Sequence, residues 1–384
     1  MLKKPYLMIP GPTPVPDRVL QAMHRPVINH RGPEYEAMFR DVCCKLQQVF
    51  KTKNEVLTFP AAGTGAMEAA VVNILSPGDK VLVVSIGVFG DRFAEIAGRY
   101  GAKVEKLDFP WGEAAAPAVL ADRLNKDKHK EIKAVFITHN ETSTGVTNDI
   151  KELMAACGDH PALRVVDAVS SLGAINLETD AWGVDLVVTG AQKALMLPPG
   201  LAFMAMSERA WAANKASTMP RFYWDAQSVR KSLAKGQNPY TPPVSLIFGL
   251  QESLNLLLEE GLENIFARHR LLAVMVRAGL KALGLELLAA DSVASSVVTA
   301  VKAPPGIDPK QIRKIMRERY GITLAGGHKH LEKEIFRIGH LGYVVPTDIL
   351  VTLAALEMTL AELKFDVVLG SGVSAAQKIL LAEV

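Results

Sequence analysis

The chain has 384 residues, 49% of them hydrophobic and 22% charged, with 29 glycines and 22 prolines dispersed along it. This composition is typical of a compact protein with a sizeable core, and the length favours a large domain with a smaller one beside it. A formal net charge of +3 without a basic run argues against nucleic-acid binding, and three cysteines without metal-ligand spacing argue against a metal site or a disulfide framework.

At the N-terminus, two lysines precede a short apolar stretch at residues 6–9, which prolines end from residue 10 onward. This stretch is too short for the core of a signal peptide. No window of about 18 uninterrupted apolar residues occurs in the chain, so the sequence predicts no transmembrane helix. We therefore expect a cytoplasmic protein that binds no membrane.

From about residue 55 to residue 206, short β-rich apolar runs alternate with longer segments of helical period, which predicts an α/β domain with a mainly parallel sheet. The predicted strands cover residues 56–59, 81–85, 104–107, 134–138, 164–167, 186–189 and 201–206. The predicted helices between them cover residues 65–75, 89–100, 117–124 and 148–157.

Beyond residue 239 the pattern changes to two long amphipathic helices joined at Gly261, followed by mixed elements. The predictions here are helices at 245–260, 262–283, 309–320 and 347–363, and strands at 295–301 and 335–338. This mixture predicts a small α+β domain packed on the first. We expect an N-terminal segment of residues 1–20, a large domain of residues 21–260 and a small C-terminal domain of residues 261–384.

In an open α/β sheet, ligands bind beyond the carboxyl ends of the strands. After the first predicted strand, residues 60–68 form a small-residue loop that runs into a helix. Backbone N–H groups at such a helix start attract a phosphate, although a plain strand-to-helix turn has the same sequence character. The loop matches neither G-x-G-x-x-G nor the P-loop pattern, so a simple phosphate monoester is the remaining candidate ligand.

An acidic residue, Asp167, ends the apolar run at residues 163–166. An acid in this position is as readily a helix cap or a hydrogen-bonded core carboxylate as a functional group. In the functional interpretation, its carboxylate keeps a pyridine nitrogen protonated, which makes the ring a better electron sink.

A lysine, Lys193, follows the predicted strand at 186–189 within a segment of small residues. Most lysines at strand ends are exposed and inert. In a dry pocket beside a cationic cofactor, however, the pKa of the ammonium group falls and the amine becomes a nucleophile for an aldehyde. The small neighbours would leave room for a ring.

The order of phosphate loop, Asp167 and Lys193 at strand ends of one domain matches the phosphate, ring nitrogen and aldehyde of pyridoxal 5'-phosphate (PLP). The chain resembles the class V, fold-type I PLP-dependent aminotransferases, and within them the alanine–glyoxylate, serine–glyoxylate and serine–pyruvate group. The resemblance runs through nearly the whole chain and rests on residues 11–16, 30–34, 62–69, 139–146, 167–171, 192–193 and 198–200. It implies an α/β fold with a mainly parallel seven-stranded sheet flanked by helices, plus a small C-terminal α+β domain.

By this resemblance, Lys193 would bind the cofactor's aldehyde and then move a proton at the substrate's Cα, while Asp167 would pair with the ring nitrogen. Phe89 matches the aromatic residue that stacks on the ring, although a core Phe at a helix start fits the sequence too. Other cofactor-binding positions implied by the family are Ala62, Gly63, Thr64, Thr142, Val169 and Gln192, together with Thr241, which would reach the phosphate of the neighbouring subunit in a homodimer.

Near the other end of the chain, Arg337 matches the family's arginine for the substrate carboxylate. A guanidinium fork suits a carboxylate because two parallel hydrogen bonds fix both its position and its plane. The resemblance therefore implies transamination between alanine or serine as donor and glyoxylate or pyruvate as acceptor.

The sequence fits the alternatives to transamination to different degrees. A cysteine desulfurase needs a cysteine in the second domain and typically a His before the Lys, but no cysteine follows Cys157 and Gln192 precedes Lys193. A PLP lyase or decarboxylase stays open, because the outcome depends on which Cα bond stands perpendicular to the ring. A catalytically degenerate subunit also stays open, since some relatives are named subunits of a soluble hydrogenase. The missing G-x-G-x-x-G disfavours an NAD-dependent oxidoreductase.

Overall fold

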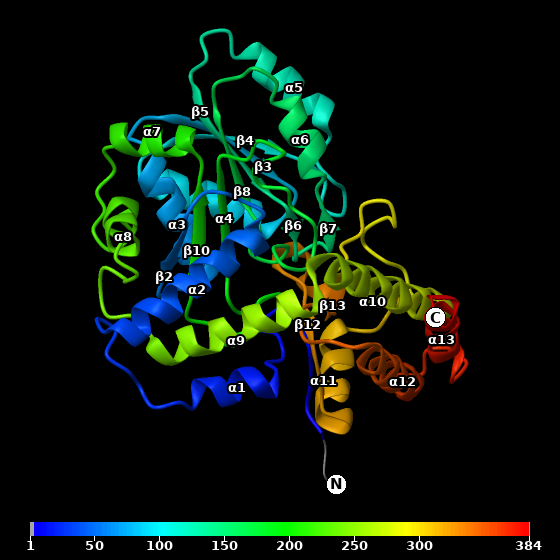
Figure 1. Ribbon diagram of the computed structural model, residues 1–384. Helices are drawn as coiled ribbons and strands as arrows, with labels where there is room; N and C mark the ends of the chain where they lie inside the picture. Colours follow the sequence, from blue (N-terminus) through cyan, green and yellow to red (C-terminus); the bar gives the residue numbers. More distant parts are fainter. Residues whose placement is uncertain (1–3, 384) are drawn as a thin grey trace.

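The structure, a computed structural model, describes residues 4–383 (Figure 1). The outermost ends of the expected N-terminal segment and C-terminal domain, residues 1–3 with one lysine of the N-terminal pair and Val384, lie outside the described residues. Within the described part, no helix is long and apolar enough to cross a membrane, and no group of three or more His, Cys, Asp or Glu side chains is arranged to hold a metal ion.

A seven-stranded sheet forms the centre of the larger part of the molecule, as the sequence predicts. Its order is β2 (Val56–Phe59), β10 (Ala202–Met206), β9 (Leu186–Gly190), β8 (Leu163–Asp167), β5 (Ile132–Thr138), β3 (Lys80–Ser85) and β4 (Lys103–Asp108). Strand β10 pairs antiparallel with both of its neighbours, while the pairs from β9 to β4 are all parallel. The predicted strands differ from these bounds by two residues at most.

Helices cover both faces of this sheet because successive residues of each buried strand point to opposite sides. In β3, Leu82 and Val84 face one core and Val81 and Val83 face the other. The first core is closed by α2 (Pro33–Phe50), α5 (Pro117–Lys126), α6 (Ile150–Ala156) and α9 (Val244–Glu260). The second is closed by α3 (Gly63–Ile74), α4 (Val88–Arg99), α7 (Glu208–Ala216) and α8 (Ala226–Leu233).

A second, four-stranded sheet contains β1 (Tyr6–Met8), β12 (Ile322–Gly326), β13 (Ile335–Gly339) and β11 (Val298–Lys302), in that order. Around it lie α10 (Leu262–Ala282), α11 (Pro309–Tyr320), α12 (Pro346–Glu362), α13 (Ser371–Glu383) and the 3-10 turn η1 (Lys329–Lys333), on the opposite side of the molecule from α7 and α8 (Figure 1). Two short strands, β6 (Asn140–Glu141) and β7 (Val146–Thr147), form a hairpin, and α1 (Asp17–Met23) contacts α9.

Several of these elements are not among the predicted ones. Strand β1 has three residues, too few to show a period, and it is parallel to β12 although more than 300 residues separate the two. Helix α2 does carry a helical pattern, with Tyr35, Met38, Phe39, Val42 and Leu46 all buried on one face, and this signal was available. Because β1 belongs to the C-terminal sheet, the chain crosses from that sheet to the strand ends of the larger one within a few residues.

Candidate active site

Asp167 is the last residue of β8, opposite Val188 of the adjacent parallel strand β9, and Lys193 lies just beyond the carboxyl end of β9. Burial, and then the positive charge of Arg337, lowers the pKa of Lys193 to about 8. Burial raises the pKa of Asp167 to about 7, against the hydrogen bond that its carboxylate accepts from the Val169 N–H at 2.9 Å. The structure thus brings a nucleophilic amine and a desolvated carboxyl to one end of the sheet.

The N-terminal segment closes over Lys193. The Nζ of Lys193 donates a hydrogen bond to the carbonyl of Pro10 at 2.6 Å, and the Thr13 hydroxyl donates to the Lys193 carbonyl at 2.9 Å. A Cβ on Gly11, whose φ is +135°, would lie 2.6 Å from Nζ. A side chain at residue 11 would therefore collide with the lysine, which accounts for glycine there.

The small-residue loop makes a cradle with residues from two other strand ends. A Cβ on Gly63 would meet the Val169 side chain at 2.8 Å, and a Cβ on Gly190 would lie 3.1 Å from the Cα of Gly63. Helix α3 starts at Gly63 with Ala62 as N-cap, and Ala62 offers no side-chain acceptor to the first-turn N–H groups. The N–H of Gly65 is bonded to the Ala62 carbonyl at 2.8 Å, so the N–H groups of Gly63 and Thr64 are the ones available to an anion.

The side chain of Gln192 is a second feature of this cradle that is consistent with a bound ligand. Its Oε1 is buried without a hydrogen-bond partner among residues 4–383, and it lies 3.0 Å from the position of a Cβ on Gly190. A half-turn of the amide presents its NH2 group to the same space. The uncapped helix start and the unpaired amide together fit the phosphate of a PLP molecule.

Arg92, which the sequence analysis missed, brings positive charge to this cradle. Its Nη1 donates to the Thr64 hydroxyl at 3.3 Å, and its guanidinium lies 4.7 Å from the centre of the Phe89 ring. Among the described residues it makes no ion pair. The ring of Phe89 is half-buried and not a core side chain, and it forms a T-shaped pair with His328, with 6.5 Å between ring centres.

Glu141 holds the start of α4, and with it Phe89, in place. The buried carboxylate accepts from the N–H groups of Phe89 at 3.0 Å and Gly90 at 3.3 Å, and from both the N–H and the hydroxyl of Ser143. A carboxylate at a helix N-terminus also complements the helix dipole. Burial raises the pKa of Glu141. The predicted motif 139–146 contained this residue, but no local signal marked its function.

Arg337 lies on β13 and is 4% exposed, not on an exposed edge. Its Nε donates to the Gly326 carbonyl at 2.8 Å and its Nη1 to the Thr142 carbonyl at 2.6 Å, while its Nη2 lies 3.0 Å from His328 Nε2. Burial lowers its pKa to about 10. No acid pairs with it within the described residues, so a buried cation is left for an incoming anion. The contact of Thr142 with this site is through its carbonyl.

Thr241 is not brought to the other site residues within one chain. It is exposed, in the loop between α8 and α9, and makes no hydrogen bond within the described part of the chain. Hydrogen bonds from two other residues hold this loop in place. Arg31 donates to the carbonyls of Asn238 and Pro239, and the Tyr35 hydroxyl donates to the Asn238 side chain at 2.5 Å.

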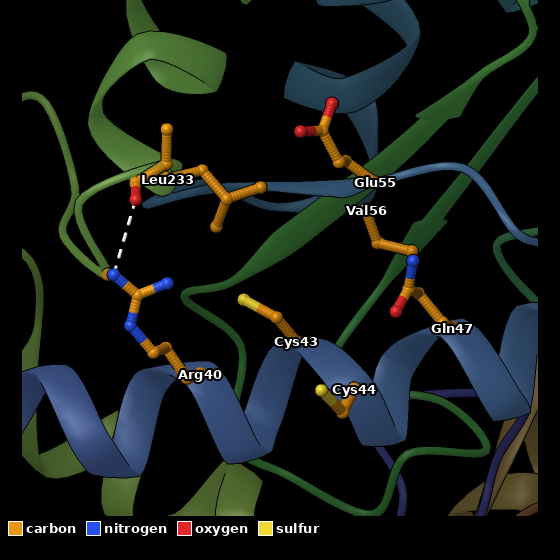
Figure 2. A pocket seen from close by; sticks show the side chains of 9 residues that line it. Arg40, Cys43, Cys44, Gln47, Glu55, Val56 and Leu233 are labelled. Atoms are coloured by element: carbon orange, nitrogen blue, oxygen red, sulfur yellow. Dashed lines mark hydrogen bonds between the residues drawn. The ribbon is translucent and has the colours of Figure 1, made fainter.

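A separate cavity of about 310 Å³ lies between α2, α8 and the edge strand β2 (Figure 2). Figure 2 shows Cys43 and Cys44 on α2, with Leu233 and Val56 on the other side of the cavity. Burial raises the pKa of Cys43 to about 12, so its thiol stays protonated and unreactive. None of the predicted site residues lines this cavity.

Residues 5–341 match the family model of class-V aminotransferases. The chain is 47% identical to the small subunit of a soluble hydrogenase from Synechococcus sp. (strain PCC 6716), over 99% of each chain. It is 42% identical to the serine–glyoxylate aminotransferase of Hyphomicrobium methylovorum, over 98% of this chain and 94% of that one. The crystal structure of ureidoglycine–glyoxylate aminotransferase from Bacillus subtilis superimposes with a TM-score of 0.93 at 32% identity, covering 99% of each chain.

Proposed function

The chain belongs to the class-V aminotransferase family, which implies PLP as its cofactor, and on that premise we propose that it transfers an amino group from alanine or serine to glyoxylate or pyruvate. The observation that carries the proposal is the buried, unpaired Arg337 close to Lys193, since it offers a carboxylate site beside an amine of lowered pKa. Relatives that are named glyoxylate aminotransferases support glyoxylate as the acceptor.

Five residues would hold the cofactor at the strand ends. Gly63, Thr64 and Gln192 would bind its phosphate, with Arg92 balancing the phosphate charge. Asp167 would face the ring nitrogen, and the pKa of its carboxyl would fall again beside that cation. When bound, PLP supplies an aldehyde for the amino group and a ring that withdraws electrons from the substrate's Cα.

Lys193 acts as the base in this proposal. With a pKa of about 8, its amine is neutral in a useful fraction of molecules near neutral pH. It could therefore take the proton from the substrate's Cα and deliver it to the cofactor. The Pro10 carbonyl, which accepts from Nζ at 2.6 Å, holds the amine within the site. The strand ends and the N-terminal segment cover most of the Lys193 side chain.

Arg337 orients the substrate. A guanidinium has five N–H groups, and three of them already face the Gly326 carbonyl, the Thr142 carbonyl and His328. One N–H on Nη1 and one on Nη2 remain, and this pair matches the two oxygens of an α-carboxylate. Donors and acceptors that lack a carboxylate should therefore bind poorly.

We also propose that the chain forms a homodimer with shared sites. We further propose that domain boundaries lie at residues 20 and 260. The exposed Thr241, on a loop that Arg31 and Tyr35 hold rigid, supports a role toward the phosphate of a neighbouring subunit. The alternatives of a lyase, a decarboxylase or a degenerate subunit are separated from transamination by the reaction products.

The test is a two-substrate assay of the purified protein loaded with PLP. Incubation with serine or alanine alone should change the cofactor's absorbance once, and continuous turnover should need glyoxylate or pyruvate as well. Release of CO2, or turnover of the amino acid without an acceptor, would contradict transamination. Lys193→Ala should lower the rate by a factor of at least ~10², because it removes the base, and an unchanged rate would refute its role.

A further inference from the structure

His328 lies in the segment between β12 and η1 and contacts the proposed carboxylate-binding arginine. Its Nε2 is 3.0 Å from Nη2 of Arg337. No motif around His328 signals chemistry, so the sequence alone predicts no role for it. Its partner is nine residues away on β13, and the turn of the chain between the two strands brings the side chains together.

The protonation state of His328 follows from this contact. A guanidinium has only donors, so Nε2 must accept the hydrogen bond, and the imidazole is neutral with its proton on Nδ1. The charged groups facing the ring are Arg337 on β13 and Arg92 on α4. Burial, and then the positive charges of Arg337 and Arg92, lower the pKa of His328 and keep the ring in this accepting form.

The position of the ring is fixed from two sides. It forms a T-shaped pair with Phe89, with 88° between the ring planes. The next residue, Lys329, pairs with Asp91 on α4 at 2.6 Å. His328 therefore stands between the start of α4 and β13, and it can hold the arginine side chain against rotation.

Without an acceptor at His328, the guanidinium would keep its bonds to the Gly326 and Thr142 carbonyls but would leave Nη2 unpaired on one side. Both N–H groups of Nη2 would then compete for the substrate, and the fork would no longer have one preferred orientation. The cost falls on carboxylate binding and not on proton transfer, because the ring makes no contact with Lys193 among the described hydrogen bonds.

We propose that His328 is a positioning residue, whose neutral imidazole accepts from Arg337 and turns the two free N–H groups of the guanidinium toward the α-carboxylate shared by donor and acceptor. This inference rests on the proposed function. It names a residue that sets affinity and selectivity for α-carboxylates.

The test compares His328→Leu, which fills the space without an acceptor, with His328→Gln, whose amide oxygen can accept. The measurement is the single-turnover rate of cofactor conversion against serine concentration in the PLP-loaded enzyme. We expect the Leu variant to need about tenfold more serine for half-saturation, with a maximal rate close to that of the wild type, and the Gln variant to recover most of the loss.

A second readout separates positioning from a general structural effect. Ethanolamine is serine without its carboxylate, so its slow conversion should be the same in all three proteins, and only the preference for serine should fall in the Leu variant. Melting temperature and cofactor affinity serve as controls and should not change.

Equal half-saturation for serine in the Leu variant and the wild type would overturn the inference, as would a Gln variant that behaves like the Leu variant. If the wild type converts no amino acid at all, the proposed function is wrong and the inference is overturned with it. If the wild type reacts normally and the variants match it, only the role of His328 is wrong.

Discussion

Burial in the folded protein, and not the neighbouring residues in the sequence, sets the pKa values of the two central side chains of the site. Lys193 and Asp167 follow ordinary strand ends, yet desolvation moves the two pKa values toward each other, to about 8 and about 7. Each shift disfavours the charged form, as expected for an ionisable group removed from water. A cationic ring between them would reverse the shift of the acid and sustain that of the lysine.

The lowered pKa of Lys193 makes a prediction for the cofactor-free protein. Only the neutral amine attacks an aldehyde, so the rate of PLP capture should rise with pH up to about 8 and then level off. Stopped-flow absorbance measures this rate. Arg337→Gln removes a nearby positive charge and should move the plateau to higher pH. A wild-type rate that keeps rising to about pH 10, the ordinary range of a lysine, would contradict the prediction.

At the scale of elements, the start of α4 depends on a carboxylate from another part of the chain. Glu141 on β6 accepts from the N–H groups of Phe89 and Gly90 and from Ser143, so one side chain joins the hairpin to the helix. Gly87 makes room for it, because a Cβ there would lie 2.5 Å from the carboxylate carbon. The aromatic ring that is proposed to stack on the cofactor is thereby fixed by a hydrogen-bonded cap.

Glu141→Ala should lower the free energy of unfolding by about 3 kcal/mol, because it leaves several buried donors without an acceptor. Glu141→Gln keeps one oxygen and the shape, so its cost should be smaller. Urea unfolding measures both. Glu95→Ala, on the exposed part of the same helix, is the matched control and should change stability by less than about 0.5 kcal/mol. Equal stability of the Ala variant and the wild type would show that Glu141 is not a cap.

At the scale of the whole molecule, the buried titratable groups predict sensitivity to acid. Burial lowers the pKa of His139 to about 4 and of His269 and His340 to about 3. Below about pH 6.5 the unfolded chain takes up protons on these histidines, but the folded chain does not. The contribution of the neutral histidines to the free energy of unfolding is therefore fully present above that pH and is lost as the pH falls. The raised pKa values of Asp167 and Glu141 act in the opposite direction, but they belong to fewer groups.

We therefore expect the free energy of unfolding to fall between about pH 6.5 and pH 4, at about 1.4 kcal/mol per pH unit for each proton that is not compensated. Urea unfolding curves at several pH values measure this slope. His340→Gln removes one of the titrating groups, so the slope should become smaller by the contribution of one proton, about 1.4 kcal/mol per pH unit. A slope that the substitution leaves unchanged would show that His340 is not among the groups responsible.

The seven strands of the large sheet, to within two residues at each end, and the order of the phosphate loop, Asp167 and Lys193 can be predicted from the sequence alone. These features are local, because strand period, small residues and turn residues are read within a few positions of each other. The family resemblance added Arg337 and the cofactor, and the match of residues 5–341 to the class-V model confirms the family.

Which of these segments contact each other is visible only in the folded protein. The contact of Lys193 with Pro10 joins residues 183 positions apart, and that of Arg337 with Thr142 joins residues 195 positions apart. The cap that Glu141 forms on α4 joins residues 52 positions apart, whereas the acceptor at His328 lies only nine residues from Arg337, across the turn between β12 and β13. No period or spacing in the sequence reports these contacts, because they depend on how the folded segments pack against each other.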